Sequence, residues 1–208
     1  MTDEKPLIYV VDDDLSVRKA LERLLRSGGY GVTTFASALE FMNYGPSDAP
    51  GCLVLDIKMP ELSGLELQER LLEKDILIPI VFITGHGTVP ASVRALKAGA
   101  TDFLEKPFKE MDLLDAVSRG VKKHHILMKQ KRRMISLTAR LHTLTPRERE
   151  VFKLVVSGML NKQVAYDLGI TEKTVKVHRA QVMKKMKAES FADLVRFAET
   201  LGIRSSIP

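Results

Sequence analysis

The feature that most constrains the fold of this chain is an apolar run that ends in a carboxylate, at residues 52–56. Four apolar residues lead directly into Asp56, and Lys58, Met59 and Pro60 follow it. A short run of this kind is typical of a strand buried on both faces in a parallel sheet. Such sheets bind ligands at the carboxyl ends of their strands. The run therefore places Asp56 at a binding edge, where a buried acid needs a cationic partner.

Other predicted strands of the N-terminal half end in polar groups as well. Further strands are predicted over residues 7–11, 30–35, 79–83 and 101–104, with amphipathic helices between them. This alternation is typical of an α/β fold, in which helices cover both faces of a parallel sheet. The polar residues at the strand ends are Asp12, Asp13, Asp56, Thr84 and Lys106.

Three carboxylates, a hydroxyl and an ammonium group would therefore meet at one edge of the sheet. Neighbouring acids repel one another unless a cation joins them, and Mg²⁺ is a divalent ion that prefers oxygen ligands. The set leaves room for a phosphoryl group between metal, hydroxyl and ammonium. A lone Asp56 would more simply cap a turn or a helix. The prediction of a metal and phosphoryl site therefore depends on the other acids, the hydroxyl and the ammonium group at the same edge.

The charge of the chain is divided unevenly along its length. Residues 1–120 have a balance of −6, whereas residues 121–208 have a balance of +12, which together give the net charge of +6. This division predicts an acidic domain joined to one that meets a polyanion, although basic helices can also be merely solvated. Cys52 is the single cysteine, which excludes an internal disulfide framework and fits the cytoplasm. No apolar run is long enough for a membrane span, so no membrane partner is expected.

The C-terminal half contains the pattern of a helix-turn-helix motif. Thr145 and Glu148 form a capping box with Pro146 at the first helical position. Asn161 is expected to cap a second helix that ends at Gly169, and Thr171 to cap a third helix over residues 172–187. Between these halves, residues 123–142 predict a solvated helical linker. Adjacent histidines at its start do not share a helical face, so a metal site there is not favoured.

The third helix has a face that suits the major groove of DNA. Lysines on this face can meet phosphates or guanine edges, and two small apolar side chains can meet a thymine methyl group. A solvated lysine face is the alternative. Arg179 falls on a flank, from which it is expected to reach a phosphate. The predicted face itself includes the lysines Lys173, Lys176 and Lys184 and the small apolar residues Val177 and Ala180.

Residues 7–122 resemble a response-regulator receiver domain. The resemblance is carried by Asp12-Asp13, Asp56 with Lys58-Met59-Pro60, Gly64, Thr84 and Lys106-Pro107, all in order and spacing. It implies a flavodoxin-like parallel sheet of order 2-1-3-4-5. The tract around residues 84–103 looks most like the FixJ branch.

The same resemblance implies roles for individual residues. Asp56 would accept a phosphoryl group from the phosphohistidine of a sensor histidine kinase, and Thr84 and Lys106 would contact its oxygens. Phe103 matches the aromatic switch position. Mg²⁺ would be held by Asp13, Asp56 and the Lys58 carbonyl, with Asp12 assisting through water. Lys58 and His86 occupy positions that affect the lifetime of the phosphoryl group.

Residues 143–201 resemble the LuxR/NarL-type DNA-binding domain. The resemblance is carried by residues 144–151, by Asn161-Lys162 and by residues 174–178. It implies a small all-α domain that binds double-stranded DNA as a dimer through the helix at residues 172–187. Lys162, Thr171 and Lys173 would contact phosphates, and Thr174 lies beside them. Some relatives use a polar residue where Ala180 stands, so base preference does not carry over.

Together these patterns predict a receiver domain over residues 1–122, a helical linker over 123–142 and a helix-turn-helix domain over 143–208. The expected function is that of a two-component transcriptional regulator, which phosphorylation of Asp56 drives to a homodimer on DNA, with RNA polymerase as a further partner. A receiver acting as a phosphate sink beside a vestigial DNA-binding domain is a second hypothesis. A metal-dependent phosphatase is a third, but no second general acid or substrate cap is evident, so an enzyme is not expected.

Overall fold

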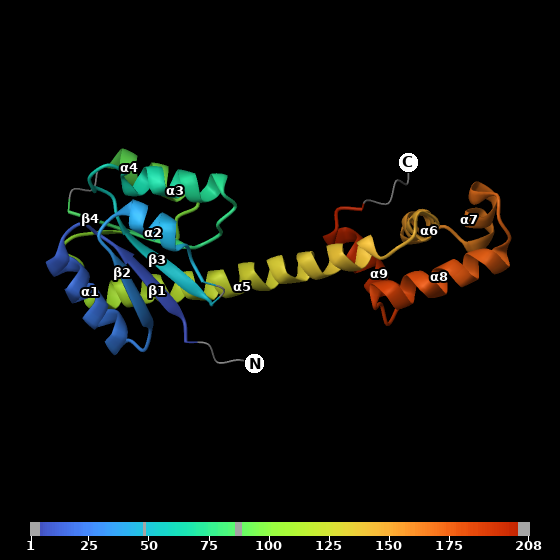
Figure 1. Ribbon diagram of the computed structural model, residues 1–208, viewed down its shortest axis with the longest axis horizontal. Coiled ribbons are helices and arrows are strands. Elements are labelled where there is room, and N and C mark those ends of the chain that lie inside the picture. The colour runs from blue at the N-terminus through green and yellow to red at the C-terminus, as the bar shows by residue number, and fades with distance from the viewer. Residues whose placement is uncertain (1–4, 48, 86–88, 204–208) are drawn as a thin grey trace. The chain divides into compact units, whose positions relative to one another are not determined.

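The computed structural model describes residues 5–47, 49–85 and 89–203, without the side chains of residues 89–91 (Figure 1). Two compact units divide the chain, Met1–Met128 and Lys129–Pro208. His86, to which the sequence assigns an influence on phosphoryl lifetime, lies outside the described residues.

The described part of the N-terminal unit contains a parallel sheet of five strands in the order β2-β1-β3-β4-β5. This order confirms the predicted flavodoxin-like α/β fold, and the predicted strands begin within a residue of the observed ones. The strands are β1 (Leu7–Val11), β2 (Gly31–Phe35), β3 (Gly51–Asp56), β4 (Ile80–Thr84) and β5 (Asp102–Glu105).

Helices cover both faces of this sheet, as Figure 1 shows. Helices α2, α3 and α4 pack on one face, and α1 and the first part of α5 pack on the other. In strand β1 successive side chains are buried on opposite faces of the sheet, so every position is apolar. Tyr9 and Val11 pack in one core, while Ile8 and Val10 pack in the other. The helices are α1 (Leu15–Ser27), α2 (Ala38–Tyr44), α3 (Gly64–Glu73), α4 (Val89–Lys97) and α5 (Glu110–His142).

Polar side chains fix where several of these helices begin. Asp14 accepts hydrogen bonds from the backbone N–H groups of Ser16 and Val17, so the third acid of the run after β1 caps α1. Ser63 and Glu66 form a capping box at the start of α3, directly after the loop that follows Asp56. These caps fix the entry to α1 and α3 at the binding edge of the sheet.

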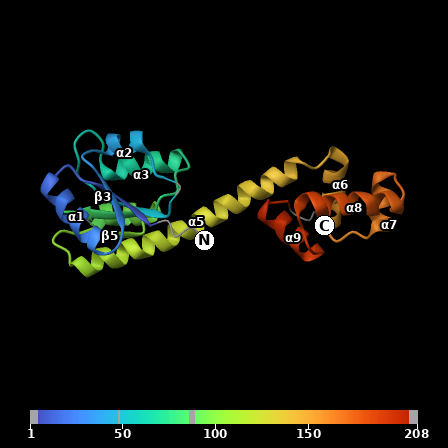
Figure 2. The same cartoon turned by 60° about the horizontal axis from the view of Figure 1, so that its bottom comes forward.

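The described C-terminal unit is all helical (Figure 2). Its helices are α6 (Pro146–Val156), α7 (Asn161–Leu168), α8 (Glu172–Met186) and α9 (Phe191–Thr200). Thr145 and Glu148 form the predicted capping box, and Gly169 ends α7 in the left-handed conformation that glycine adopts most readily. The prediction that Asn161 caps α7 is wrong: Leu160 is the N-cap residue, and its N–H group donates to the side-chain oxygen of Gln163.

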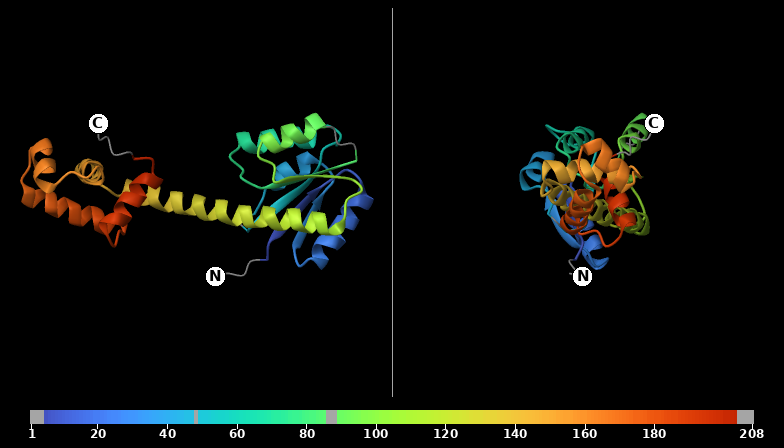
Figure 3. Two further views of the ribbon diagram at one scale, coloured as in Figure 1. Left: turned by 180° about the vertical axis from the view of Figure 1, so that it is seen from behind. Right: turned by 90° about the vertical axis from the view of Figure 1, so that its right-hand side faces the viewer.

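Helix α5 begins on the sheet and continues through the predicted linker (Figure 3). Gly120 allows it to approach β3 closely, since a Cβ atom there would lie 2.6 Å from the sulfur of Cys52. One turn later, Nδ1 of the buried His124 accepts a hydrogen bond of 2.8 Å from the Gly51 N–H group. The first residues of the predicted linker therefore pack within the N-terminal unit. Residues 129–136 are all exposed.

We expect His124→Ala to lower the free energy of unfolding by about 1–3 kcal/mol, because it leaves the buried Gly51 N–H group without an acceptor. Chemical denaturation of the full chain at pH 8 measures this loss. His125→Ala is the matched control, since His125 is exposed and should change stability by less than about 0.5 kcal/mol.

The effect of His124→Ala should also depend on pH. Burial lowers the pKa of His124 below its ordinary value of 6.5, and only the neutral imidazole can accept the Gly51 hydrogen bond at Nδ1. The unfolded chain therefore takes up a proton first as the pH falls. The stabilisation is fully present above pH 6.5 and is lost below it. A difference between His124→Ala and wild type that stays constant from pH 8 to pH 5 would contradict this assignment.

Candidate functional sites

The carboxyl edge of the sheet brings together two buried acids and one lysine. Asp12 follows β1 and Asp56 ends β3, and both side chains are almost fully buried. The Lys106 ammonium group lies between them, 2.8 Å from Oδ2 of Asp12 and 3.1 Å from Oδ1 of Asp56. The predicted convergence of these three side chains is therefore present in the structure.

The electrostatics of this cluster leave the acids short of positive charge. Burial raises the pKa of Asp56, the charge of Asp12 raises it further, and the bond to Lys106 only partly opposes this rise. Burial also works against the Lys106 ammonium, but its bonds to both carboxylates keep its pKa above the ordinary value. A further cation beside Asp56 would therefore be favoured.

The other predicted receiver residues lie around this cluster. Thr84 is buried at the end of β4, and its carbonyl oxygen accepts a 2.7 Å hydrogen bond from the Lys106 N–H group. The Lys58 N–H group donates to Oδ2 of Asp56 over 2.9 Å, while the Lys58 side chain is exposed. Asp13 is exposed beside Asp12. Phe103 lies half-buried on β5, against the core that α2, α3 and α4 cover.

The donor atoms at this edge fit a hard cation in kind. The acids that the sequence assigns to Mg²⁺ offer only oxygen, which is the ligand that this ion prefers. Among the described residues, no group of three or more histidine, cysteine or acidic side chains is already gathered as a metal site. In the structure, the Lys106 ammonium group occupies the position between the two buried carboxylates. It is the oxygen donors of the acids that match magnesium in chemistry.

Gly64 fixes the loop that follows β3. Its N–H group donates to the Ile57 carbonyl over 3.0 Å, so the start of α3 lies against the end of β3. A Cβ atom on Gly64 would lie 2.3 Å from the Asp56 carbonyl oxygen. Since this distance is far below a van der Waals contact, residue 64 must be glycine for the backbone of Asp56 to keep its place.

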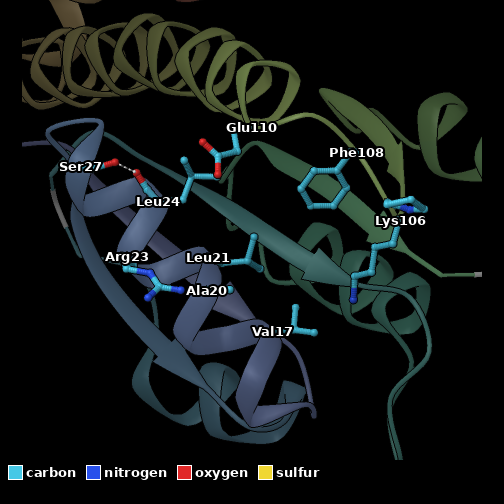
Figure 4. Close-up of a pocket in the computed structure, with 10 residues that line it drawn as sticks. Val17, Ala20, Leu21, Arg23, Leu24, Ser27, Lys106, Phe108 and Glu110 are labelled. Carbon is cyan, nitrogen blue, oxygen red and sulfur yellow. Dashed lines mark hydrogen bonds between the residues drawn. The ribbon is translucent and has the colours of Figure 1, made fainter.

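A hollow of about 500 Å³ lies beside Lys106, between α1 and the segment that leads into α5. Figure 4 shows Lys106 and Phe108 on one side of it and Val17, Leu21 and Leu24 of α1 on the other. The Lys106-Pro107 peptide bond at its edge is cis. The hollow is lined by apolar side chains of α1 together with Phe108, and by the polar residues Arg23, Lys106 and Glu110.

Helix α8 presents the predicted face to solvent. Its exposed apolar residue Val177 is 56% accessible, and the lysines of the face are exposed around it. Val175, Val182 and Met186 are buried on the opposite side. Thr171 caps the helix, and its hydroxyl lies 2.9 Å from that of Thr174. The exposed residues are Lys173, Lys176, Val177, Ala180, Lys184 and, on the adjoining α7, Lys162.

Several basic side chains of this domain are used inside it, which the sequence alone did not show. Lys185 donates to the buried Glu148 over 2.6 Å, so the capping acid of α6 is also an ion-pair partner of α8. Arg147 donates to the Leu168 carbonyl at the end of α7. Arg179, which is expected to reach a phosphate, donates a hydrogen bond to the Asn161 side chain in the structure. Helical spacing puts Arg179 near the directions of the buried Val175 and Met186, which is the signal in the sequence for this internal contact.

Two families match the chain in these two regions. The family described as response regulator receiver domain matches residues 8–118, and bacterial regulatory proteins of the luxR family match residues 142–198. Together they account for both candidate sites. No helix among the described residues is long and apolar enough to cross a membrane.

Full-length relatives and solved structures agree with this division. Nodulation protein W of Bradyrhizobium diazoefficiens is 48% identical over 97% of this chain and 89% of its own. Transcriptional regulatory protein FixJ of Rhizobium meliloti is 44% identical over 96% of this chain and 98% of the FixJ chain. The structure of response regulator StyR matches with a TM-score of 0.84 at 47% identity, covering 94% of this chain and 99% of StyR. The structure of full-length FixJ from B. japonicum matches with a TM-score of 0.57 at 40% identity, covering 96% of this chain and 98% of that FixJ chain.

We expect Gly64→Ala to lower the free energy of unfolding by about 1–3 kcal/mol, because the new Cβ atom collides with the Asp56 carbonyl oxygen. Denaturant unfolding of the full chain measures the loss. Gly85→Ala is the control, since nothing lies within 4 Å of a Cβ atom there. Equal stability of Gly64→Ala and Gly85→Ala would show that the loop after Asp56 can shift freely.

Proposed function

The chain belongs to the two-component response regulators with a LuxR-type DNA-binding domain, and we propose that phosphorylation of Asp56 by a partner histidine kinase controls its binding to DNA. The observation that carries this proposal is the Lys106 ammonium group held between the buried Asp12 and Asp56 carboxylates. This arrangement supports the proposal because Asp56, the proposed nucleophile, lies beside an ammonium group that would contact phosphoryl oxygens. The chain regulates transcription, as its family does.

In the proposed reaction, a carboxylate oxygen of Asp56 attacks the phosphorus of the phosphohistidine. The new P–O bond forms as the P–N bond to histidine breaks, which gives an acyl phosphate. Lys106 and the Thr84 hydroxyl would contact the phosphoryl oxygens. Mg²⁺, held by Asp12, Asp13, Asp56 and the Lys58 carbonyl, would supply positive charge to the transferred group when bound. The hollow beside Lys106 would receive the kinase.

The added charge of about −1.5 to −2 at Asp56 would then act on the nearby strand ends. Thr84 would move toward the phosphoryl oxygens, and Phe103 would swing inward and change the face made by residues 88–104. Val93 and Leu96 lie on this face and are 43% and 47% exposed, so it has apolar surface to offer a second copy of the chain. We propose that a homodimer forms here.

Dimer formation would pair two DNA-binding domains on one two-fold site. Affinity would rise through effective concentration rather than through new base contacts. RNA polymerase is proposed as a further partner, and the cytoplasm as the location. The proposed contacts with DNA lie on the exposed face of α8, at its N-cap and at the start of α7. They are Lys162, Thr171, Lys173, Thr174, Lys176, Val177, Ala180 and Lys184.

The two other hypotheses predict different behaviour. A phosphate sink with a vestigial DNA-binding domain would keep regulation after Val177→Glu, whereas a DNA-binding regulator would lose it. A phosphatase would turn over a small phosphate ester repeatedly. We propose a regulator rather than an enzyme, with at most slow hydrolysis of its own phosphoryl group.

Asp56→Asn should abolish phosphate uptake from acetyl phosphate in the presence of Mg²⁺, because the amide is not a nucleophile. Phosphate incorporation is measured by intact mass. Asp14→Asn is the control: asparagine caps a helix as well as aspartate does, so uptake should match wild type. Labelling of Asp56→Asn at the wild-type level would remove Asp56 from the proposal.

Lys176→Gln should weaken binding to all duplexes and make it less sensitive to salt. Each phosphate contact that is lost changes the slope of log K against log [salt] by about 0.9. Fluorescence anisotropy between low and moderate salt measures this slope with the full chain and beryllofluoride, an acyl-phosphate mimic. Lys5→Gln, an exposed lysine before β1, should leave the slope unchanged. An unchanged slope for Lys176→Gln would exclude Lys176 from the DNA interface.

A further inference from the structure

Arg179 lies on the inner side of α8, away from the face proposed to bind DNA. Successive residues of an α-helix are about 100° apart, which puts Arg179 about 160° from Val177 at one edge of the exposed face and about 110° from the middle of that face. This direction is close to that of the buried Val175 and Met186. The side chain is correspondingly half-buried. A cation thus stands where the helical pattern calls for an apolar residue.

The Arg179 side chain joins three helices through two contacts. Its Nη1 atom donates a hydrogen bond of 2.7 Å to Oδ1 of Asn161, the first residue of α7. Its guanidinium carbon lies 5.7 Å from the centroid of the Phe191 ring, and Phe191 is the first residue of α9. One side chain of α8 therefore holds the starts of both neighbouring helices.

These contacts explain how a guanidinium group is tolerated on the inner side of the helix. The aromatic face attracts the cation and the Asn161 oxygen accepts from it, so part of the lost hydration is replaced. The planar guanidinium can stack and donate at the same time, which the ammonium group of a lysine cannot do. The Asn161 oxygen is available because Leu160, not Asn161, is the N-cap residue of α7.

We propose that Arg179 is a positioning residue that fixes the recognition helix against the start of α7. Lys162 is the neighbour of Asn161 on α7, whereas Lys173 and Lys176 lie on α8. The bond between Arg179 and Asn161 sets the distance between these two groups of lysines, which must match the phosphates along one groove. The proposal rests on the exposed face of α8 being the DNA-binding face. In it, Arg179 acts through protein contacts and neutralises no phosphate.

Arg179→Met separates positioning from phosphate contact. Methionine fills the inner position with an apolar chain of similar length, and replacing a buried polar contact in this way often leaves stability intact. The probe is a duplex that wild-type protein selects from a randomised pool, with the unselected pool as the comparison. We expect about tenfold weaker binding of the selected duplex by the full chain, an unchanged salt slope, and pool binding within about twofold of wild type.

Lys176→Gln is the matched control, because it should reduce the salt slope and weaken both probes together. Arg179→Lys should behave like Arg179→Met, since lysine keeps the charge but cannot stack on Phe191 and reach Asn161 at once. In an Asn161→Ala background, Arg179→Met should have little further effect. Thermal unfolding of each variant verifies that the domain stays folded, and Arg179→Lys carries the test if Arg179→Met does not.

The proposal is overturned by wild-type binding of the selected duplex by both Arg179 variants. It is equally overturned if Arg179→Met lowers the salt slope as Lys176→Gln does while Arg179→Lys restores it, because Arg179 would then contact a phosphate. An unchanged slope for Lys176→Gln is a different result, which would count against the proposed DNA face itself.

Discussion

The N-terminal unit depends on one constraint: two buried carboxylates must share a single ammonium group. Asp12 and Asp56 come from neighbouring parallel strands, so the sheet order brings their ends together whatever their charge. Lys106 reaches both, and without it the two acids would stand buried and uncompensated, which costs on the order of 3–5 kcal/mol for a broken buried pair. An anion that approaches Asp56 must therefore compete with these two carboxylates for the Lys106 ammonium group.

The backbone around this edge is as constrained as its charges. Gly64 lets α3 begin against the carbonyl of Asp56, and the Lys58 N–H group donates to Oδ2 of the Asp56 side chain. One carboxylate oxygen of Asp56 thus faces the loop and the other faces Lys106. Groups on both sides therefore hold this carboxylate in one orientation.

The sequence predicted the strands and the convergence at their ends because both follow from local pattern and topology. A short apolar run is typical of a strand buried on both faces, and the carboxyl ends of parallel strands lie on one edge of the sheet. The burial of His124 could not be predicted in this way. Its hydrogen bond joins it to Gly51, which is far away in the sequence, and the basic helix around it carries no local pattern that indicates a buried imidazole. Asn161 carries a typical capping side chain, yet its oxygen serves Arg179 instead. Local propensity gave way to tertiary contact in both cases.

The net charge of the C-terminal half also needed the structure for its interpretation. A balance of +12 over residues 121–208 suggests that all of this charge faces a polyanion. Lys185 is paired with Glu148, and Arg147 and Arg140 donate to the last carbonyls of α7 and α8. These cations act at the ends of helix dipoles or against a buried acid, where they stabilise the fold. Among the cations that remain, Lys173, Lys176 and Lys184 lie together on one exposed face of α8.

Helix α5 shows how packing at two points can maintain a segment that has little support of its own. Residues 129–136 are exposed and rich in basic side chains, and a helix this short is not stable alone in water. Its flanks are packed: His124 bonds to Gly51 on one side, and the buried Leu137 lies on the other. The helical turns at these two points supply the nucleus, and propagation then needs only one hydrogen bond per residue. Loosening either flank would consequently weaken the exposed stretch before it affected the two cores.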